Sequence, residues 1–238
     1  MIEYDTADAW FTTPRGTPVL FRYRVGTNDW NTLWACLNED EYGLASEYPA
    51  VAVDIGGYLG GVAIGIAVDN PKARVLVVEP VPDNIDLIRW AIEANKLTDR
   101  IVVIPGAVGD GSAVDVAYRY RGTEAVEHHA FVGNSTLAYD NPGGFLSHDT
   151  VTYTSLTVAD IVGRVGEPDL VKIDTEGGEW SFLAQDVDLL PLVLGEWHPV
   201  RGHGIGDLLA LLEPTHVVSF TGPQAGPGGF RAVRRVTS

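Results

Sequence analysis

Carboxylates and one histidine follow two predicted strands in the second half of the chain. Asp174 is the last residue of the strand-like stretch 169–174, and Glu176 lies two residues after it. His198 follows a second strand-like stretch, which begins at 192. Two carboxylates spaced two residues apart at a strand end are expected to face the same side. Asp174, Glu176 and His198 are therefore candidates for a base that removes a proton from a substrate, since imidazole titrates near neutral pH. His198 is equally consistent with a hydrogen-bonded histidine of purely structural role.

A glycine-rich turn follows an apolar run that ends near Asp54. Gly56, Gly57 and Gly60 surround Tyr58 in this turn, which is typical of the first strand-to-helix connection of a nucleotide-binding α/β unit. A dinucleotide fingerprint needs glycine where this chain has Tyr58, and Asp54 places an anion where a pyrophosphate would bind. The turn therefore favours a ligand with a cationic group, such as S-adenosylmethionine. We expect Asp54 and the backbone of the turn to hold its amino acid end, with tight strand–helix packing as the alternative.

The end of the next apolar run carries Glu79. An acid at this position takes the ribose hydroxyls of an adenosine group. Asn84 is either a second contact to the sugar or a helix cap. The loop that follows the third predicted strand is expected to lie against the adenine, with the backbone of Ala107 and Val108 as its contacts.

Strands alternate with helices through the rest of the chain. This pattern predicts an α/β, Rossmann-like fold with a mostly parallel seven-stranded sheet, helices on both faces and an antiparallel last strand. In such a sheet the ligand lies across the carboxyl ends of the strands. The predicted strands are 51–54, 74–78, 101–104, 169–174, a strand entered at 192–194, 217–220 and 230–233, and the predicted helices are 60–69, 84–95, 157–164 and 205–212.

Residues 1–50 do not follow this alternation, and we interpret them as an N-terminal cap or extension packed on a domain formed by 51–238. Residues 18–25 alternate enough for a strand or hairpin arm. Four apolar residues then fall at helical spacing: Trp30, Leu33, Trp34 and Leu37. We expect both tryptophans to be part of the core, since large aromatic side chains at helical spacing usually pack inward.

The segment from about 105 to 150 is too long for a simple connection, and long loops in compact domains are commonly functional. Alternation over 113–120 and again over 151–156 predicts a hairpin, joined by a mobile segment over the site. His128, His129 and His148 lie in this segment and are expected to be exposed.

Composition restricts the partners. The chain of 238 residues has 32 Asp and Glu against 16 Lys and Arg, a formal net charge of −16. An acidic surface repels phosphate backbones and anionic lipids, so nucleic acid and membrane partners are disfavoured and a small-molecule substrate is expected. Cys36 is the only cysteine, and no signal peptide is evident at the start, which together favour a cytoplasmic protein. The oligomeric state is not readable from the sequence.

The chain resembles the FkbM-type methyltransferases, a branch of the class I S-adenosylmethionine-dependent fold. The stretches that carry the resemblance are Asp54–Gly60, Glu79-Pro80, Lys172–Glu179, Glu196-x-His198, Arg24–Asp29 and Glu41-Tyr42. The resemblance implies methyl transfer from S-adenosylmethionine to a hydroxyl of a sugar or other secondary metabolite. It also implies that Pro80 and Asp174 contact the cofactor, as Glu79 does.

Two further hypotheses concern the acids of the second half of the chain. Asp174, Glu176, Glu179 and Glu196 offer the oxygen ligands that Mg²⁺ accepts, although acids clustered near a cofactor cation explain the same residues without metal. Glu179 is better explained as an anion at the start of the next helix, and Lys172 as a partner of one of the acids inside the sheet. The rival functions are an NAD(P)-dependent oxidoreductase and a non-catalytic nucleotide-binding domain.

Overall fold

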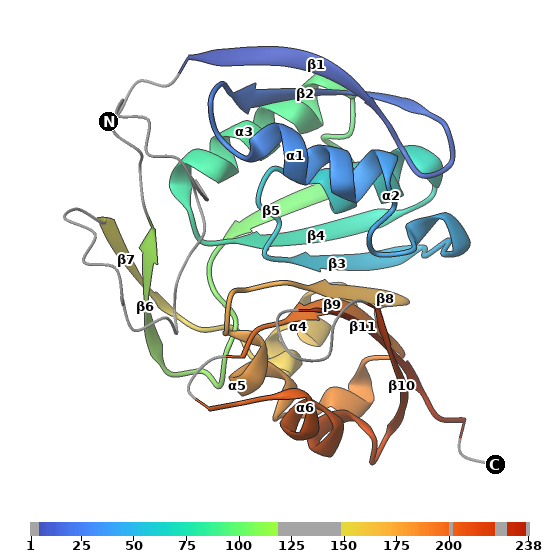
Figure 1. Ribbon diagram of the computed structural model, residues 1–238, viewed down its shortest axis with the longest axis vertical. Helices are drawn as coiled ribbons and strands as arrows, with labels where there is room; N and C mark the ends of the chain where they lie inside the picture. Colours follow the sequence, from blue (N-terminus) through green and yellow to red (C-terminus); the bar gives the residue numbers. More distant parts are fainter. Residues whose placement is uncertain (1–4, 119–148, 200–201, 222–227, 237–238) are drawn as a thin grey trace.

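The computed structural model describes the whole chain except residues 1–4, 119–148, 200–201, 222–227 and 237–238. A seven-stranded sheet runs through its centre in the order β10-β11-β9-β8-β3-β4-β5 (Figure 1). Its strands are β3 (Val51–Ile55), β4 (Arg74–Glu79), β5 (Ile101–Pro105), β8 (Leu170–Ile173), β9 (Leu192–Trp197), β10 (His216–Thr221) and β11 (Gly228–Arg234). The five strands β9, β8, β3, β4 and β5 each pair in parallel with the next, while β11 is antiparallel to both its neighbours, β9 and β10. The predicted sheet, including its antiparallel last strand, is confirmed.

Helices cover both faces of the sheet, as predicted. On one face lie α2 (Gly61–Asp69) and α3 (Pro82–Ala94), and on the other lie α4 (Val158–Val165), α5 (Glu179–Leu183), a 3₁₀ turn η3 (Val187–Leu189) and α6 (Ile205–Leu212). Because both faces are covered, β3, β4 and β8 are almost wholly buried, which explains why they read as continuous apolar runs. The core consists of two hydrophobic clusters, one on each side of the sheet.

The N-terminal part folds as a hairpin of β1 (Thr6–Thr12) and β2 (Pro18–Arg24), followed by α1 (Asp29–Leu33), a π-helical turn η1 (Trp34–Asn38) and a 3₁₀ turn η2 (Leu44–Ser46). Figure 1 shows this part lying over α2 and α3. Phe21 and Leu37 belong to the same hydrophobic cluster as Ile64 and Ile88, so the N-terminal part shares its core with the rest of the chain.

The prediction that Trp30 and Trp34 belong to the core is wrong. Their exposed fractions are 37% and 42%, whereas Leu33 and Leu37 on the same turns are fully buried. The two indoles stack on each other with ring centroids 6.4 Å apart. The inward face of the helix is already occupied by the leucines, so the tryptophans remain on the outer face.

A second hairpin, formed by β6 (Ala113–Tyr118) and β7 (Asp149–Thr154), confirms the two strands predicted around the long connection. The segment that joins them, with His128, His129 and His148, lies outside the described residues. Within the described ranges, no helix combines the length and apolar character needed to cross a membrane.

Candidate active site

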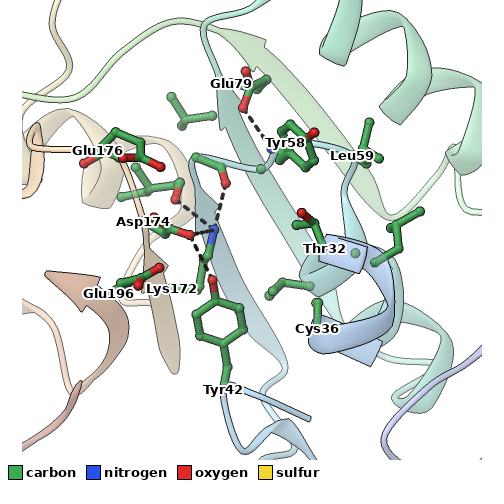
Figure 2. Close-up of a pocket in the computed structure, with 18 of the residues that line it drawn as sticks. Thr32, Cys36, Tyr42, Tyr58, Leu59, Glu79, Lys172, Asp174, Glu176 and Glu196 are labelled. Carbon is green, nitrogen blue, oxygen red and sulfur yellow. Dashed lines mark hydrogen bonds and ion pairs between the residues drawn. The ribbon is translucent and has the colours of Figure 1, made fainter. Parts of the chain in front are cut away.

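A cavity of about 350 Å³ lies at the carboxyl ends of β3, β4 and β8, the edge at which the sequence predicts a ligand (Figure 2). Most of the predicted site residues line it: Gly56, Gly57, Tyr58, Glu79, Pro80, Ala107, Val108, Asp174 and Glu176. Four predicted site residues do not line it: Asp54, Gly60, Asn84 and His198. The fold therefore brings together residues that are more than 100 positions apart in the sequence.

The glycine turn is shaped by close contact with β8. Gly56 has φ +74°, and a Cβ at this position would lie 1.7 Å from the backbone oxygen of Asp174. A Cβ on Gly57 would lie 2.4 Å from Cγ1 of Val77. Tyr58 has a positive φ of 49°, which is uncommon for a residue with a side chain. These glycines are therefore required by the approach of the turn to the sheet, whatever ligand the cavity holds.

Asp54 is fully buried and pairs with the lysine of the neighbouring strand. Its Oδ1 lies 3.4 Å from Nζ of Lys172, and its Oδ2 accepts a hydrogen bond from the backbone N–H of Ala63. Nζ of Lys172 also donates to the backbone oxygen of Gly56 at 2.7 Å. Burial raises the pKa of Asp54, and the lysine opposes this shift. The sequence predicted that Lys172 pairs with one of the acids of the second half of the chain. Asp174 is such a partner, with its Oδ2 at 4.0 Å from Nζ, but the closer partner, Asp54, was not predicted.

Glu79 is also buried, and its carboxylate accepts three hydrogen bonds. The donors are the backbone N–H groups of Tyr58 and Val81, at 2.8 and 2.9 Å, and Nδ2 of Asn84 at 3.1 Å. Burial raises the pKa of Glu79 to about 7, although the three donors favour the ionised form. Since a carboxylate offers about four acceptor positions, roughly one remains for a ligand in the cavity.

A buried network connects Glu79 to the N-terminal part of the chain. Arg24 forms a two-pronged ion pair with Asp29, and its Nη2 also donates to Oδ1 of Asn84 at 2.8 Å. The hydroxyl of Tyr58 donates to Oδ1 of Asp29 at 2.5 Å, which closes the ring. Sequence reasoning noted Arg24 and Asp29 only as part of the family resemblance. Their contact with Asn84 could not be predicted, because these residues are far apart in the sequence.

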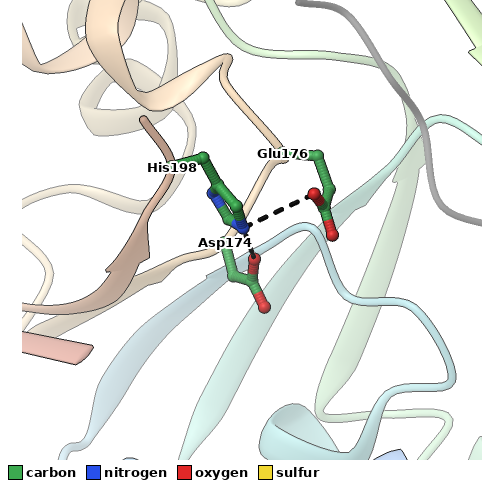
Figure 3. Close-up of side chains that lie close together, drawn as sticks. All are labelled: Asp174, Glu176 and His198. Atoms are coloured by element: carbon green, nitrogen blue, oxygen red, sulfur yellow. Dashed lines mark ion pairs between the residues drawn. The ribbon is translucent and has the colours of Figure 1, made fainter. Parts of the chain in front are cut away.

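At the opposite end of the cavity, Asp174 and Glu176 line the wall, and the third predicted catalytic residue, His198, lies beside them outside the lining (Figure 3). Nε2 of His198 lies 3.5 Å from Oε2 of Glu176 and 3.9 Å from Oδ1 of Asp174. Its Nδ1 lies 3.1 Å from Oε1 of Glu179, which also accepts the backbone N–H of His198. The other oxygen of Glu179 accepts from Thr175 and from the backbone of Gly177. Glu179 therefore stabilises the turn before α5 and fixes the imidazole at the same time.

Burial and neighbouring charges shift the pKa values of the groups at this end. Burial raises the pKa of Glu176 to about 7, and Asp174 adds to the shift while His198 opposes it. Burial alone would lower the pKa of His198, but the hydrogen bond to Glu179 and the charges of the other two acids outweigh it and raise it to about 9. The pKa of Glu196 is raised by burial and by Asp174.

Two residues from the N-terminal part complete this end, and the sequence analysis assigned them no role. The hydroxyl of Tyr42 donates to Oδ2 of Asp174 at 2.9 Å, as Figure 2 shows, and Glu41 lines the cavity beside it. The pair Glu41-Tyr42 was visible in the sequence only as part of the family resemblance. Its proximity to β8 depends on the packing of the N-terminal part.

Comparison with curated proteins finds partial matches to methyltransferases. The chain is 34% identical over 105 residues to a Mycobacterium tuberculosis protein named "Probable O-methyltransferase", which spans 44% of this chain and 40% of that protein. It is 32% identical over 77 residues to the release factor glutamine methyltransferase of Rhodopirellula baltica, spanning 32% of this chain and 26% of that protein. The matches thus cover less than half the length of these relatives.

Among solved structures, the chain is similar to an O-methyltransferase from Bacillus cereus in complex with SAH. The TM-score is 0.45 with 15% identity, and the match covers 79% of this chain and 74% of that one. The model of the Methyltransferase FkbM domain matches residues 54–215, which is more than half of the chain. The chain therefore belongs to the FkbM methyltransferase family.

Proposed function

We propose that this chain is an S-adenosylmethionine-dependent methyltransferase that transfers a methyl group to a hydroxyl of a small molecule, such as a sugar or another secondary metabolite. Family membership supports methyl transfer, and the charge of the cavity supports the donor. Among the described residues that line the cavity, five are acidic: Glu41, Glu79, Asp174, Glu176 and Glu196. The single lysine, Lys172, is already paired with Asp54.

The charge balance of the cavity is the observation that carries this proposal. An excess of carboxylates attracts a ligand with a sulfonium and an amine, and repels the pyrophosphate of a nicotinamide dinucleotide. The residues present therefore fit S-adenosylmethionine better than NAD.

We assign the glycine-turn side of the cavity to the donor. The backbone of Gly56–Gly60 receives the amino acid end, and Asp54 acts from beneath by holding Lys172 and the start of α2 in place. Glu79 accepts one ribose hydroxyl at its remaining acceptor position, rather than the two expected from the sequence, and Asn84 orients it. Pro80, Ala107 and Val108 form the wall for the adenine.

We assign the end formed by Asp174, Glu176 and His198 to the acceptor. When bound, S-adenosylmethionine supplies a methyl group on a positively charged sulfur, which leaves as a neutral thioether. The three side chains, as a unit, orient the acceptor hydroxyl in line with that methyl group and take up its proton. Their negative charge also lies beside the sulfonium before transfer.

Calorimetric titration of the purified protein with S-adenosylmethionine and, separately, with NAD tests the donor. We expect saturable binding of S-adenosylmethionine and no heat from NAD, because only the first ligand matches the charge of the cavity. Binding of NAD alone would contradict the proposal. Transfer of labelled methyl groups to a fractionated small-molecule extract then tests the acceptor class, and label only on amines or carbon would contradict O-methylation.

A further inference from the structure

The two nitrogens of the His198 imidazole face different carboxylates. The side chain is 4% exposed, and its Nδ1 is held by the buried carboxylate of Glu179. Its Nε2 is within ion-pair distance of two carboxylates, at 3.5 Å from Glu176 and 3.9 Å from Asp174. Both separations are longer than a hydrogen bond of normal length. This nitrogen faces Glu176 and Asp174 (Figure 3).

The three facing atoms have the spacing of a set of metal ligands. Nε2 of His198 and one oxygen each of Asp174 and Glu176 all lie within 4.8 Å of one another. Metal–ligand bonds of about 2.0–2.2 Å place the donor atoms of a filled site about 3–3.5 Å apart. The two distances from Nε2, 3.5 and 3.9 Å, are too long for strong hydrogen bonds but close to this separation.

Neighbouring groups already orient the ligand atoms. Histidine ligands of metals characteristically donate their other ring N–H to a carboxylate, and Glu179 occupies that position on His198. Tyr42 donates to Oδ2 of Asp174, which leaves Oδ1 directed at the imidazole.

We propose that Asp174, Glu176 and His198 bind one divalent first-row metal ion of the Mn²⁺ type. Mixed carboxylate and imidazole donors suit such an ion better than Mg²⁺, which prefers oxygen alone. The set differs from the magnesium ligands predicted from the sequence, because both oxygens of Glu179 are turned to Thr175, Gly177 and His198. Three protein ligands leave coordination positions open toward the cavity, where an acceptor oxygen could bind.

Binding of Mn²⁺ can be measured without any methyl donor. Metal-free protein is titrated with MnCl₂, and the free ion is followed by its electron paramagnetic resonance signal. We expect one ion per chain and an affinity at least tenfold lower in H198Q and E176Q. In E179Q, which keeps all three ligands but alters the contact to the imidazole, we expect an affinity about 10–100-fold lower.

The control is Glu93→Gln, which removes an exposed acid from α3 and should bind Mn²⁺ like the unaltered protein. The metal site would be overturned if Mn²⁺ binding were not saturable. It would also be overturned if H198Q and E176Q bound Mn²⁺ as tightly as the unaltered protein, since the ions would then be bound elsewhere on the acidic surface. Glu176 is partly exposed, so its variant remains informative if the buried variants fail to fold. Because no methyl donor is present, failure here would leave the proposed methyl transfer untouched.

Discussion

The carboxylates at the two ends of the cavity differ in their hydrogen bonding. At one end, Glu79 accepts hydrogen bonds from three fixed donors, and Asn84 and Arg24 extend the network to Asp29. At the other end, Nε2 of His198 lies 3.5 Å from Glu176 and 3.9 Å from Asp174. Satisfied buried networks make a site rigid, whereas like charges held close together raise its energy. This difference is consistent with the roles that we propose: the Glu79 end holds the donor, and the Asp174 end exchanges protons or binds a cation.

The two ends also depend on the N-terminal part in different ways. Arg24 and Asp29 bring a fully buried ion pair to the Glu79 end, where Tyr58 closes the ring. Tyr42 brings a single hydroxyl to the Asp174 end. The N-terminal part therefore belongs structurally to the site, and loss of its contacts should affect the Glu79 end through stability and the Asp174 end through chemistry.

The largest expected effect comes from breaking the network of the Glu79 end. Asp29→Ala leaves the buried guanidinium of Arg24 without its carboxylate, and we expect the free energy of unfolding to fall by about 3–5 kcal/mol. Urea denaturation followed by circular dichroism measures this change.

The matched control is Asp8→Ala, which breaks the solvent-accessible pair with Arg22. Pairs of this kind contribute about 0–1 kcal/mol, so the control should be nearly neutral. Equal losses in the two variants would mean that burial of the Arg24 pair does not matter to stability.

At the Asp174 end, Glu176→Gln should affect the reaction more than the fold. We expect the rate of methyl transfer to fall by about 10²-fold, equivalent to about 2.7 kcal/mol, because the neutral amide can neither take up a proton nor hold a cation well. The affinity for S-adenosylmethionine should fall much less than the rate, since the contacts assigned to its ribose and amino acid end lie at the other end. Initial rates and calorimetry on the same preparations check both, with Glu93→Gln as the control, and an unaltered rate would remove Glu176 from the site.

The change in stability per pH unit, in metal-free protein, is the smallest expected effect. The pKa of Glu79 and of Glu176 rises from 4.5 to about 7 on folding, and that of His198 rises from 6.5 to about 9. The folded state thus binds more protons, and the stability from these groups is complete below the lower value and lost as pH rises through the higher one. We expect the free energy of unfolding to decrease from pH 5 to pH 9, by on the order of 1 kcal/mol per pH unit.

Denaturation curves at several pH values with a chelator present measure this slope. Between pH 4.5 and 7, Glu176→Gln should flatten the curve, because one of the acids whose pKa rises on folding is removed. A stability that increases toward pH 9 would contradict the crowding of charges at the Asp174 end.

The central sheet was predictable because the relevant signals are local. The apolar runs of β3, β4 and β8 and the intervening helical patterns appear in consecutive residues, and parallel strands place their carboxyl ends at one edge. Glu79 and Asp174 could therefore be placed beside one cavity from the sequence alone.

The orientation of individual side chains was harder to predict from the sequence. Asp54 was correctly located at the end of β3, but its carboxylate faces Lys172 and not the cavity. Trp30 and Trp34 were correctly placed on helical turns but on the wrong face, since helical spacing does not say which of two apolar faces the sheet will cover.

By itself, the sequence determined the order of strands and helices, the glycine turn and the edge of the sheet at which the acids gather, because these depend on neighbouring residues and on the geometry of parallel strands. Only the tertiary structure decided which distant groups meet. Tyr42 and Asp174 are 132 residues apart, and Arg24 and Asn84 are 60 apart, yet each pair is hydrogen-bonded. Such contacts follow from how the N-terminal part packs on α2 and α3, and that packing depends on the shape of the whole core, which no local pattern of residues encodes.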